Sequence, residues 1–271
     1  MQRQAKAGRV VRPLIAGNWK MNGTGDSLAE IAAVAGWVRE NGPHPDVLMC
    51  PPFTLISRAT GIAAGAVALG GQDCHAQMSG AFTGDVSAEM LRDAGASAVI
   101  AGHSERRRYH GETDAMVAAK AEAAWRAGLL AIVCIGETEE QRDAARTEAV
   151  VAAQLARSLP TGACRSTAAI AYEPIWAIGS GRTPGLDEIA RTHQLIRAGL
   201  VSRFGDEGSR MRILYGGSVK PENARGILAL PNVNGALVGG ASLRADEFLG
   251  IVRSAPPEPN SLYSGGRRLP G

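Results

Sequence analysis

The sequence predicts an α/β fold, a single (β/α)8 barrel, because one pattern recurs along the chain. Apolar runs too short for a helix alternate with longer amphipathic segments. The pair recurs eight times at a spacing of about 30 residues, which is typical of parallel βαβ architecture. An open doubly wound sheet is the alternative, but Gly17-Asn18-Trp19-Lys20 after the first strand is no G-x-G-x-x-G nucleotide fingerprint. We therefore favour the closed barrel.

The apolar runs and the amphipathic segments set the expected elements. Strands are expected at 14–18, 46–50, 67–71, 97–102, 129–134, 168–172, 211–215 and 235–238. Helices are expected over about 27–40, 54–64, 86–94, 139–158 and 187–204, after Thr113-Asp114, and from about Pro221 and Ala245. Parallel strands covered on both faces have continuous apolar sequences, as 168–172 does. Pro174 ends that strand, because it disfavours the α conformation at Glu173 and cannot donate a ladder hydrogen bond.

Composition supports a globular protein and disfavours two kinds of partner. At 271 residues, the chain has a length that α/β barrels routinely reach in one domain. A hydrophobic fraction of 45% provides a sizeable core. The formal charge of +3 comes from dispersed Lys and Arg with few aromatic residues between them, so nucleic-acid binding is not expected. No apolar run reaches 18 residues, so no membrane-spanning helix is expected.

The cysteines and the chain ends suggest a cytoplasmic protein with short flanking segments. Cys50, Cys74, Cys134 and Cys164 show no C-x-x-C or zinc-finger spacing, and a chain of this length needs no disulfide. Residues 1–13 are expected to be a short basic extension, since they lack the apolar segment of a signal peptide. The barrel is expected over 14–255. Residues 256–271, rich in Pro, Gly and Ser, are expected to form a disordered tail.

Polar residues follow several of the expected strands, at the end where a barrel builds its active site. Asn18 and Lys20 follow the first strand, His103-Ser104-Glu105 follows the fourth and Glu173 follows the sixth. The segment after Glu173 combines the apolar Ile175-Trp176-Ala177-Ile178 with Gly179-Ser180-Gly181. Apolar residues next to flexible ones suit a lid that covers a ligand. A lone Glu-Pro pair is usually a surface carboxylate beside a turn, so this interpretation depends on the other residues.

Four motifs resemble those of the triosephosphate isomerase family, in the same order and at similar spacing. They are Ala16-Gly17-Asn18-Trp19-Lys20-Met21-Asn22, Ala101-Gly102-His103-Ser104-Glu105-Arg106-Arg107, Ala171-Tyr172-Glu173-Pro174 and Tyr215-Gly216-Gly217-Ser218. The resemblance covers about residues 14–252. It implies a TIM barrel that interconverts dihydroxyacetone phosphate and D-glyceraldehyde 3-phosphate through an enediolate, in glycolysis and gluconeogenesis, with no cofactor or metal.

The resemblance also implies a role for each matching residue. Glu173 matches the base that removes a carbon-bound proton, and His103 matches an electrophile that acts as a neutral imidazole. Lys20 and Asn18 match residues that bind substrate and stabilise the enediolate, with Glu105 as the partner of the lysine and Ser104 in a supporting position. Phosphate is expected at the backbone N–H groups of small residues, which are Gly179, Ser218, Gly239 and Gly240. Independently of the resemblance, burial of Glu173 is expected to raise the pKa of its carboxyl.

Some positions depart from the family pattern, and one loop implies an assembly. His110 and Asn234 stand where the family more often has Phe and Asp, and Ser180 and Arg182 where it often has Thr and Lys. Residues 76–84 resemble the family's projecting dimer loop, which implies a homodimer. The remaining histidines, which are His44, His75 and His193, show no metal-binding or triad spacing and are expected to be structural.

Three alternative functions remain open from the sequence. A paralogue that isomerises a four-carbon ketose phosphate, such as an erythrulose phosphate, would carry the same catalytic residues. An aldolase on the same barrel would use Lys20 as a Schiff-base nucleophile. A non-catalytic barrel would only bind phosphorylated ligands, which the complete set of Asn18, Lys20, His103 and Glu173 disfavours.

Overall fold

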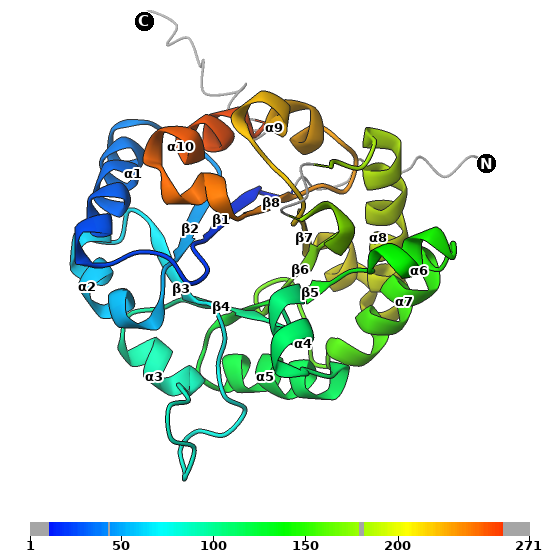
Figure 1. Cartoon of the computed structure of the whole chain (residues 1–271), viewed down its shortest axis with the longest axis horizontal. Coiled ribbons are helices and arrows are strands. Elements are labelled where there is room, and N and C mark those ends of the chain that lie inside the picture. The colour runs from blue at the N-terminus through cyan, green and yellow to red at the C-terminus, as the bar shows by residue number, and fades with distance from the viewer. Residues whose placement is uncertain (1–10, 43, 179–181, 257–271) are drawn as a thin grey trace, which may run out of the picture.

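The computed structural model describes residues 11–42, 44–178 and 182–256, and these form a closed barrel of parallel strands. The strands follow one another around the ring in sequence order, and β8 pairs with β1 to close it (Figure 1). They are β1 (Leu14–Asn18), β2 (Asp46–Cys50), β3 (Ala68–Gly71), β4 (Ala98–Ala101), β5 (Leu130–Ile135), β6 (Ala168–Tyr172), β7 (Arg212–Tyr215) and β8 (Gly235–Val238). The predicted fold class is confirmed.

Helices surround the ring and connect successive strands (Figure 1). They are α1 (Leu28–Glu40), α2 (Phe53–Ala63), α3 (Ala88–Asp93), α4 (Ser104–His110), α5 (Asp114–Arg126), α6 (Glu139–Asp143), α7 (Thr147–Ser158), α8 (Leu186–Arg210), α9 (Pro221–Leu228) and α10 (Ala245–Ser254). Short 3-10 helices are η1 (Gly25–Ser27), η2 (Ile175–Ala177) and η3 (Gly240–Leu243). Within the described ranges, no helix has the length and apolar character needed to cross a bilayer.

Three helical segments differ from the sequence prediction. The helix expected over 139–158 is two helices, α6 and α7, and Ala145 between them has a left-handed φ of 53°, which lies outside the right-handed α region. Helix α4 begins inside the His103-Ser104-Glu105 motif, before the helix that the sequence predicts. Helix α8 continues beyond Phe204 across a kink at Gly205, whose φ of 56° favours glycine.

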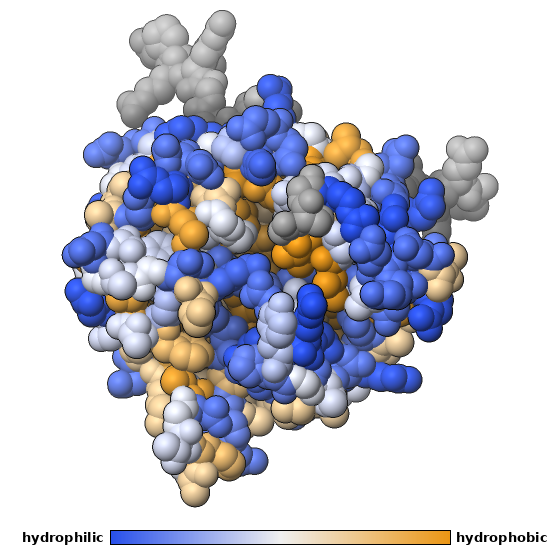
Figure 2. All heavy atoms as spheres, viewed as in Figure 1, coloured by the Kyte–Doolittle hydropathy of each residue, from blue (hydrophilic) through white to orange (hydrophobic). Residues whose placement is uncertain are grey.

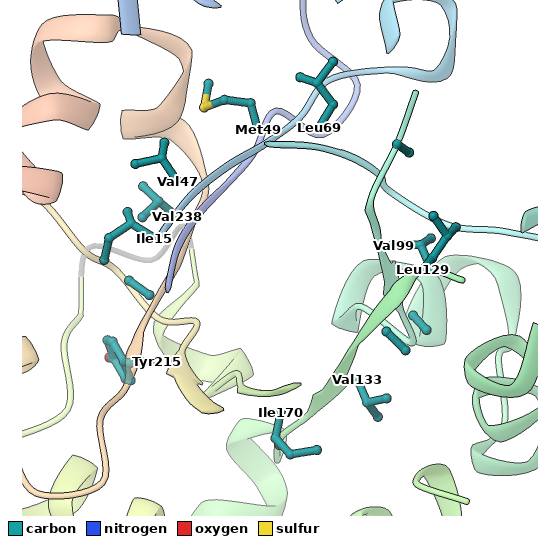
Figure 3. Close-up of a cluster of buried hydrophobic side chains, with 14 of the residues drawn as sticks. Ile15, Val47, Met49, Leu69, Val99, Leu129, Val133, Ile170, Tyr215 and Val238 are labelled. Carbon is teal, nitrogen blue, oxygen red and sulfur yellow. The ribbon is translucent and has the colours of Figure 1, made fainter. Parts of the chain in front are cut away.

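The core has two layers, one inside the barrel and one between the strands and the helices. Alternate residues of a strand point to opposite faces, so Ile132 and Cys134 lie inside the barrel while Val133 and Ile135 belong to the outer layer. Figure 3 shows side chains of the outer layer, which come from successive strands. The inner layer consists of Leu14, Ala16, Leu48, Cys50, Ala98, Ile100, Ile132, Cys134, Ala169, Ala171, Leu214 and Leu237. Because these side chains fill the barrel, a ligand is expected at its ends.

A partly buried arginine joins α8 to the segment before β8. Arg197 donates hydrogen bonds to Gly208 O, Asn232 Oδ1 and Asn234 Oδ1, the last at 2.7 Å. All three acceptors are neutral, and burial lowers the pKa of Arg197 to about 10. Asn234 is one of the positions where the sequence departs from the expected family pattern, which more often has Asp there. At this contact the guanidinium therefore lacks the opposite charge that an aspartate would supply.

Asn234→Asp is expected to raise the melting temperature by roughly 2–4 °C, because an ion pair with Arg197 replaces a hydrogen bond from the charged guanidinium to a neutral amide. The backbone N–H of Ile213, which donates to Asn234 Oδ1 at 3.1 Å, keeps its acceptor. Calorimetry at several pH values measures the change. Arg197 lowers the folded-state pKa of the new carboxyl, so the gain is present above about pH 4 and is lost as the pH falls. An equal gain in an Arg197→Met background would contradict the explanation.

Candidate active site

A cavity of about 490 Å³ opens at the carboxyl ends of the strands. Its lining residues come from the ends of strands and from the loops and first helical turns that follow them, and they are Asn18, Lys20, His103, Glu105, Glu173, Ile178, Gly216, Gly217, Ser218, Val219, Lys220, Leu237, Gly239, Gly240, Ala241 and Glu247. Ser104 contacts Glu173. Gly179 lies outside the described residues. The structure thus brings together the other residues that the sequence predicts for the site.

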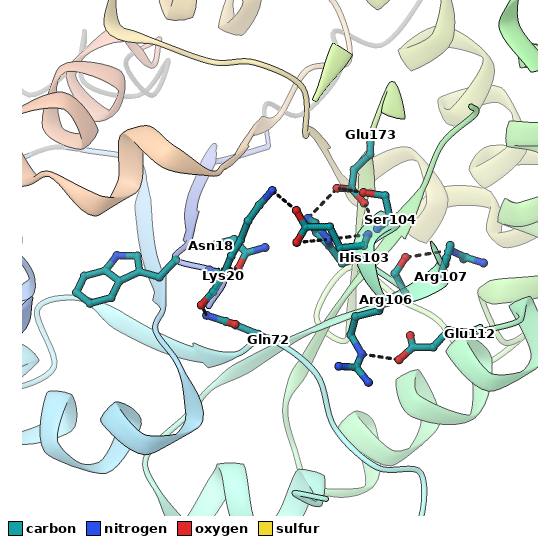
Figure 4. Close-up of polar contacts among 12 residues, drawn as sticks. Asn18, Lys20, Gln72, His103, Ser104, Arg106, Arg107, Glu112 and Glu173 are labelled. Atoms are coloured by element: carbon teal, nitrogen blue, oxygen red, sulfur yellow. Dashed lines mark hydrogen bonds and ion pairs between the residues drawn. The ribbon is translucent and has the colours of Figure 1, made fainter. Parts of the chain in front are cut away.

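Glu173 lies at the end of β6 with only 2% of its surface exposed. Its Oε1 is 3.0 Å from His103 Nε2, and the Ser104 N–H and hydroxyl donate to Oε2 and Oε1 at 3.0 and 3.2 Å (Figure 4). The Glu173 N–H donates to Ile135 O, so pairing with β5 extends one residue past the strand. A Cβ at Gly136 would lie 1.7 Å from Glu173 O, so this close approach requires glycine.

His103 is buried and is the N-cap residue of α4. Its Nδ1 accepts a hydrogen bond from the Glu105 N–H at 3.2 Å. An accepting Nδ1 carries no proton, so this contact assigns the proton to Nε2, which faces Glu173. Gly102 forms the turn before His103 with a φ of 70°, and a Cβ there would lie 2.5 Å from Val117. Glycine is therefore required to aim the histidine into the cavity.

Lys20 lies in the loop after β1 and has a left-handed backbone, with a φ of 55°. Its N–H donates to Asn18 Oδ1 at 3.0 Å, and its Nζ is 2.6 Å from Glu105 Oε1 (Figure 4). The neighbouring Trp19 is buried, and its indole N–H donates to Ser242 O in the loop after β8. The loops after β1, β4 and β8 are thereby tied together.

The loops after β7 and β8 supply a wall of small residues. Ser218, Gly239 and Gly240 all line the cavity. Gly239 lies beside Lys20, since a Cβ built on the glycine would be 3.6 Å from Lys20 Cε. Small side chains at these positions allow a ligand to approach the backbone closely.

The segment expected to form a lid is described only in part. The 3-10 helix η2 buries Trp176, whose indole N–H donates to Glu137 Oε1 at 2.9 Å. The Arg142 guanidinium lies 4.1 Å from the centre of the same ring. Gly179, Ser180 and Gly181 lie outside the described residues. Closure of this segment therefore stays a prediction.

Comparison with known proteins identifies the family. A family model described as triosephosphate isomerase matches residues 13–255. The triosephosphate isomerase of Afipia carboxidovorans is 59% identical over 247 residues, which cover 91% of this chain and 98% of that protein. The chain belongs to the triosephosphate isomerase family. The triosephosphate isomerase of Ruegeria sp. (strain TM1040) is 60% identical over 243 residues, covering 90% of this chain and 98% of that protein.

A solved structure supports the same family assignment. The crystal structure of triosephosphate isomerase from Bartonella henselae has a TM-score of 0.84 and 51% identity to this chain, covering 90% of this chain and 99% of that one. The chain is therefore an enzyme, an isomerase with a TIM barrel, as the sequence predicts. The resemblance carried by four short motifs extends over nearly the whole chain.

Burial and the contact between Glu173 and His103 act in opposite directions on the two pKa values. Burial is the largest influence on Glu173 and raises the pKa of its carboxyl, but His103, the Ser104 N–H and Cys134 together outweigh burial, so the pKa is lowered. Burial lowers the pKa of His103, but the Glu173 carboxylate outweighs burial there too, so that pKa is raised. The sequence predicts only the effect of burial on Glu173. The structure adds a direct contact that reverses the net direction.

Two charged residues of the cavity are missed by the sequence reasoning. Lys220 is the N-cap residue of α9, and Glu247 lies in the first turn of α10. The motifs contain residues that immediately follow a strand, whereas Lys220 and Glu247 lie farther along the chain, at the starts of α9 and α10. A search of the first turns after the last two strands would have found them. Within the described ranges, no group of three or more His, Cys, Asp or Glu side chains is arranged to hold a metal ion.

His103→Gln is expected to raise the pKa of Glu173. The amide can keep a hydrogen bond but removes the titratable ring, and the remaining burial favours the neutral carboxyl. The measurement is the pH dependence of the 13C shift of the Glu173 carboxyl carbon, assigned with Glu173→Gln. His44→Gln, at a histidine just before β2, is the control and should leave the titration unchanged. An unchanged or lower pKa in His103→Gln would show that the His103 contact does not set it.

Proposed function

We propose that the chain interconverts dihydroxyacetone phosphate and D-glyceraldehyde 3-phosphate by moving a proton between adjacent carbons through an enediolate. The observation that carries this proposal is the buried Glu173 carboxylate in contact with His103, in the same cavity as Lys20 and the small residues after β7 and β8. The reaction needs a base, an electrophile for the carbonyl and positive potential for the enediolate and phosphate. This cavity contains side chains suited to each task.

Glu173 acts as the base in this proposal. In the structure its carboxylate is stabilised by His103 and Ser104. A substrate bound between Glu173 and His103 separates the two groups and removes the strongest influence that lowers the pKa of the carboxyl. Burial, which raises that pKa, then dominates. Substrate binding thus converts a stabilised carboxylate into a stronger base, and Ser104 supports the resting position.

His103 polarises the substrate carbonyl through its Nε2–H. The Glu105 N–H occupies Nδ1 at 3.2 Å, so Nε2 is the nitrogen that faces the cavity. Loss of the Glu173 contact leaves burial to lower the pKa of His103, and the nearby start of α4 also disfavours a positive ring. The family resemblance implies a neutral electrophile, and these contacts support that assignment for this chain.

Lys20 and Asn18 bind the reacting end of the substrate, while small residues bind its phosphate. The Lys20 ammonium lies inside the cavity, where positive charge stabilises an enediolate. The buried Asn18 has an amide that fixes the Lys20 backbone and faces the same cavity. Ser218, Gly239 and Gly240 supply backbone N–H groups for the phosphate dianion. The resemblance adds Gly179 to this phosphate site.

The geometry bears on the alternatives. The Lys20 ammonium is 2.6 Å from Glu105 Oε1, and an ion-paired ammonium has no free electron pair for Schiff-base formation, which disfavours an aldolase. Burial of Glu173 beside His103 is unnecessary for a barrel that only binds ligands, which disfavours that function. A four-carbon ketose phosphate would require the same groups, so activity assays must separate it from the three-carbon substrate.

The proposal is tested by measuring kcat and KM with dihydroxyacetone phosphate and with an erythrulose phosphate, for the wild-type chain and for Glu173→Asp. The wild-type chain is expected to have the higher kcat/KM for the three-carbon substrate. Glu173→Asp is expected to lose roughly 10²-fold or more in kcat, with much less change in KM, because a shift of about 1 Å at the reacting proton costs that much. Near-full activity of folded Glu173→Asp would exclude Glu173 as the base. A higher kcat/KM for the four-carbon compound would show that the proposed three-carbon substrate is wrong.

We place this activity in glycolysis and gluconeogenesis in the cytoplasm, as the family resemblance implies. We also propose that residues 14–255 are the catalytic domain, between a short basic extension and a C-terminal tail. The positions of the terminal elements support these boundaries, since β1 begins at Leu14 and α10 ends at Ser254. Residues 1–10 and 257–271 lie outside the described residues.

We propose a homodimer formed through residues 76–84. The loop that contains them projects from the ring between β3 and α3, and apolar residues lie along it (Figures 1 and 2). Met78 is 54% exposed and Phe82 is 43% exposed. The Phe82 ring packs on His75, with ring centroids 4.0 Å apart, so the loop presents an ordered apolar surface. Exposed apolar side chains on such a projection favour a protein contact.

Sedimentation velocity at micromolar concentration is expected to show a dimer. A double substitution, Met78→Asp with Phe82→Asp, is expected to produce monomers, because it places charges on the apolar contact. Val201→Asp changes an apolar residue of α8 that is 42% exposed and should leave the dimer intact. A fully active wild-type monomer at this concentration would contradict the proposal.

A further inference from the structure

We infer that Gln72, in the loop after β3, is a positioning residue that fixes the backbone of Lys20 and so aims its ammonium into the cavity. Its side-chain Nε2 donates to Lys20 O at 2.8 Å (Figure 4) and to Cys50 O at 2.9 Å. Lys20 and Gln72 are 52 positions apart in the sequence. This inference rests on the proposed role of Lys20 and names a residue on which that role depends.

The backbone of Lys20 needs external support. Its φ of 55° is in the left-handed region, which a residue with a side chain rarely occupies unless its surroundings hold it there. One support is local, because the Lys20 N–H donates to Asn18 Oδ1 at 3.0 Å. Gln72 holds the other side of the same residue, at its carbonyl. Together the two amides fix the peptide groups before and after the Lys20 Cα.

Gln72 is chemically matched to this task. A glutamine amide nitrogen has two hydrogens, and both acceptors here are backbone carbonyl oxygens, so the amide orientation is set by its partners. Cys50 O is the end of β2 and also accepts the Trp19 N–H at 3.1 Å. Gln72 therefore attaches the Lys20 carbonyl to the ends of two strands. If Gln72 is lost, Cys50 O still accepts the Trp19 N–H, whereas Lys20 O loses the hydrogen bond from Gln72. The effect of the substitution therefore falls mainly on Lys20.

The Lys20 side chain transmits this constraint to the reacting end of the site. Its Nζ is 2.6 Å from Glu105 Oε1, and its Cε lies beside Gly239. The ammonium sits at the end of a four-carbon stem, so a backbone rotation at Lys20 moves it by several bond lengths unless the side chain readjusts. Glu105 alone fixes the tip of a flexible chain. Gln72 fixes its base, and the two contacts together define where the positive charge lies.

The test is a double-mutant cycle on kcat/KM with D-glyceraldehyde 3-phosphate, comparing wild type, Gln72→Leu, Lys20→Ala and the double variant. Gln72→Leu is expected to lower kcat/KM by roughly tenfold to a hundredfold, since misplacement of a catalytic group by about 1 Å costs that much. In the Lys20→Ala background it is expected to lower kcat/KM by less than about twofold, because its effect acts through the lysine. An equal loss in both backgrounds, or no loss in the wild-type background, would overturn the inference.

Two further variants separate positioning from stability. Gln72→Glu keeps the shape of the side chain but presents a carboxylate oxygen to the carbonyl oxygens of Lys20 and Cys50, so it should lose at least as much activity as Gln72→Leu. If Gln72→Glu instead has wild-type activity, the inference is overturned, even if Gln72→Leu fails to fold. Thr60→Val removes a hydroxyl that contacts Ile56 O and Ala94 O on the outer helices and should lower the melting temperature without changing kcat/KM. Full activity of Lys20→Ala would instead refute the proposed role of Lys20, a result distinct from any failure at Gln72.

Discussion

The structure of the site depends on the close contact between Glu173 and His103 across the ends of two non-adjacent strands. Glu173 follows β6 and His103 follows β4, so β5 lies between them in the ring. Their contact at 3.0 Å is possible because the backbone after β5 approaches Glu173 O at Gly136, where a Cβ would lie only 1.7 Å away. Any side chain at this position would push the loops apart. The Glu173–His103 contact, and with it the pKa shifts of both groups, therefore depends on a glycine at position 136.

That contact also makes the acid–base properties of the site depend on occupancy. Burial and the mutual contact act in opposite directions on both groups, and in the structure the contact determines the net shift. In the function that we propose, a ligand that separates Glu173 from His103 removes this contact and leaves burial as the largest influence on both pKa values. On this proposal, a carboxylate that is well stabilised in the resting enzyme becomes more basic when substrate is present. The resting contact disfavours protonation of Glu173 and favours protonation of His103.

Much of this arrangement follows from the sequence, because parallel strands bring the residues after them to one end of the barrel. Buried apolar runs predict the strands well, and the motifs predict Asn18, Lys20, His103, Glu105 and Glu173 at one cavity. Backbone conformation is not visible in this way. Nothing in the sequence shows the left-handed φ at Lys20, the residue that we infer Gln72 to support. Nothing in it shows the left-handed φ at Ala145 either, which divides the helix expected over 139–158. A glutamine 52 positions from Lys20 carries no local pattern that links the two.

The charges of the cavity decide how a phosphate dianion is bound. The described lining contains two lysines, Lys20 and Lys220, and three glutamates, Glu105, Glu173 and Glu247, which give a net charge of −1 when His103 is neutral. The summed charge of this lining therefore offers a dianion no net attraction, and the Lys20 ammonium is paired with Glu105 at 2.6 Å. In the function that we propose, the phosphate is bound by directed dipoles at close range, which backbone N–H groups beside small residues provide. The cavity-lining Ser218, Gly239 and Gly240 suit this task, and the same proposal gives Lys20 the charge that develops during the reaction.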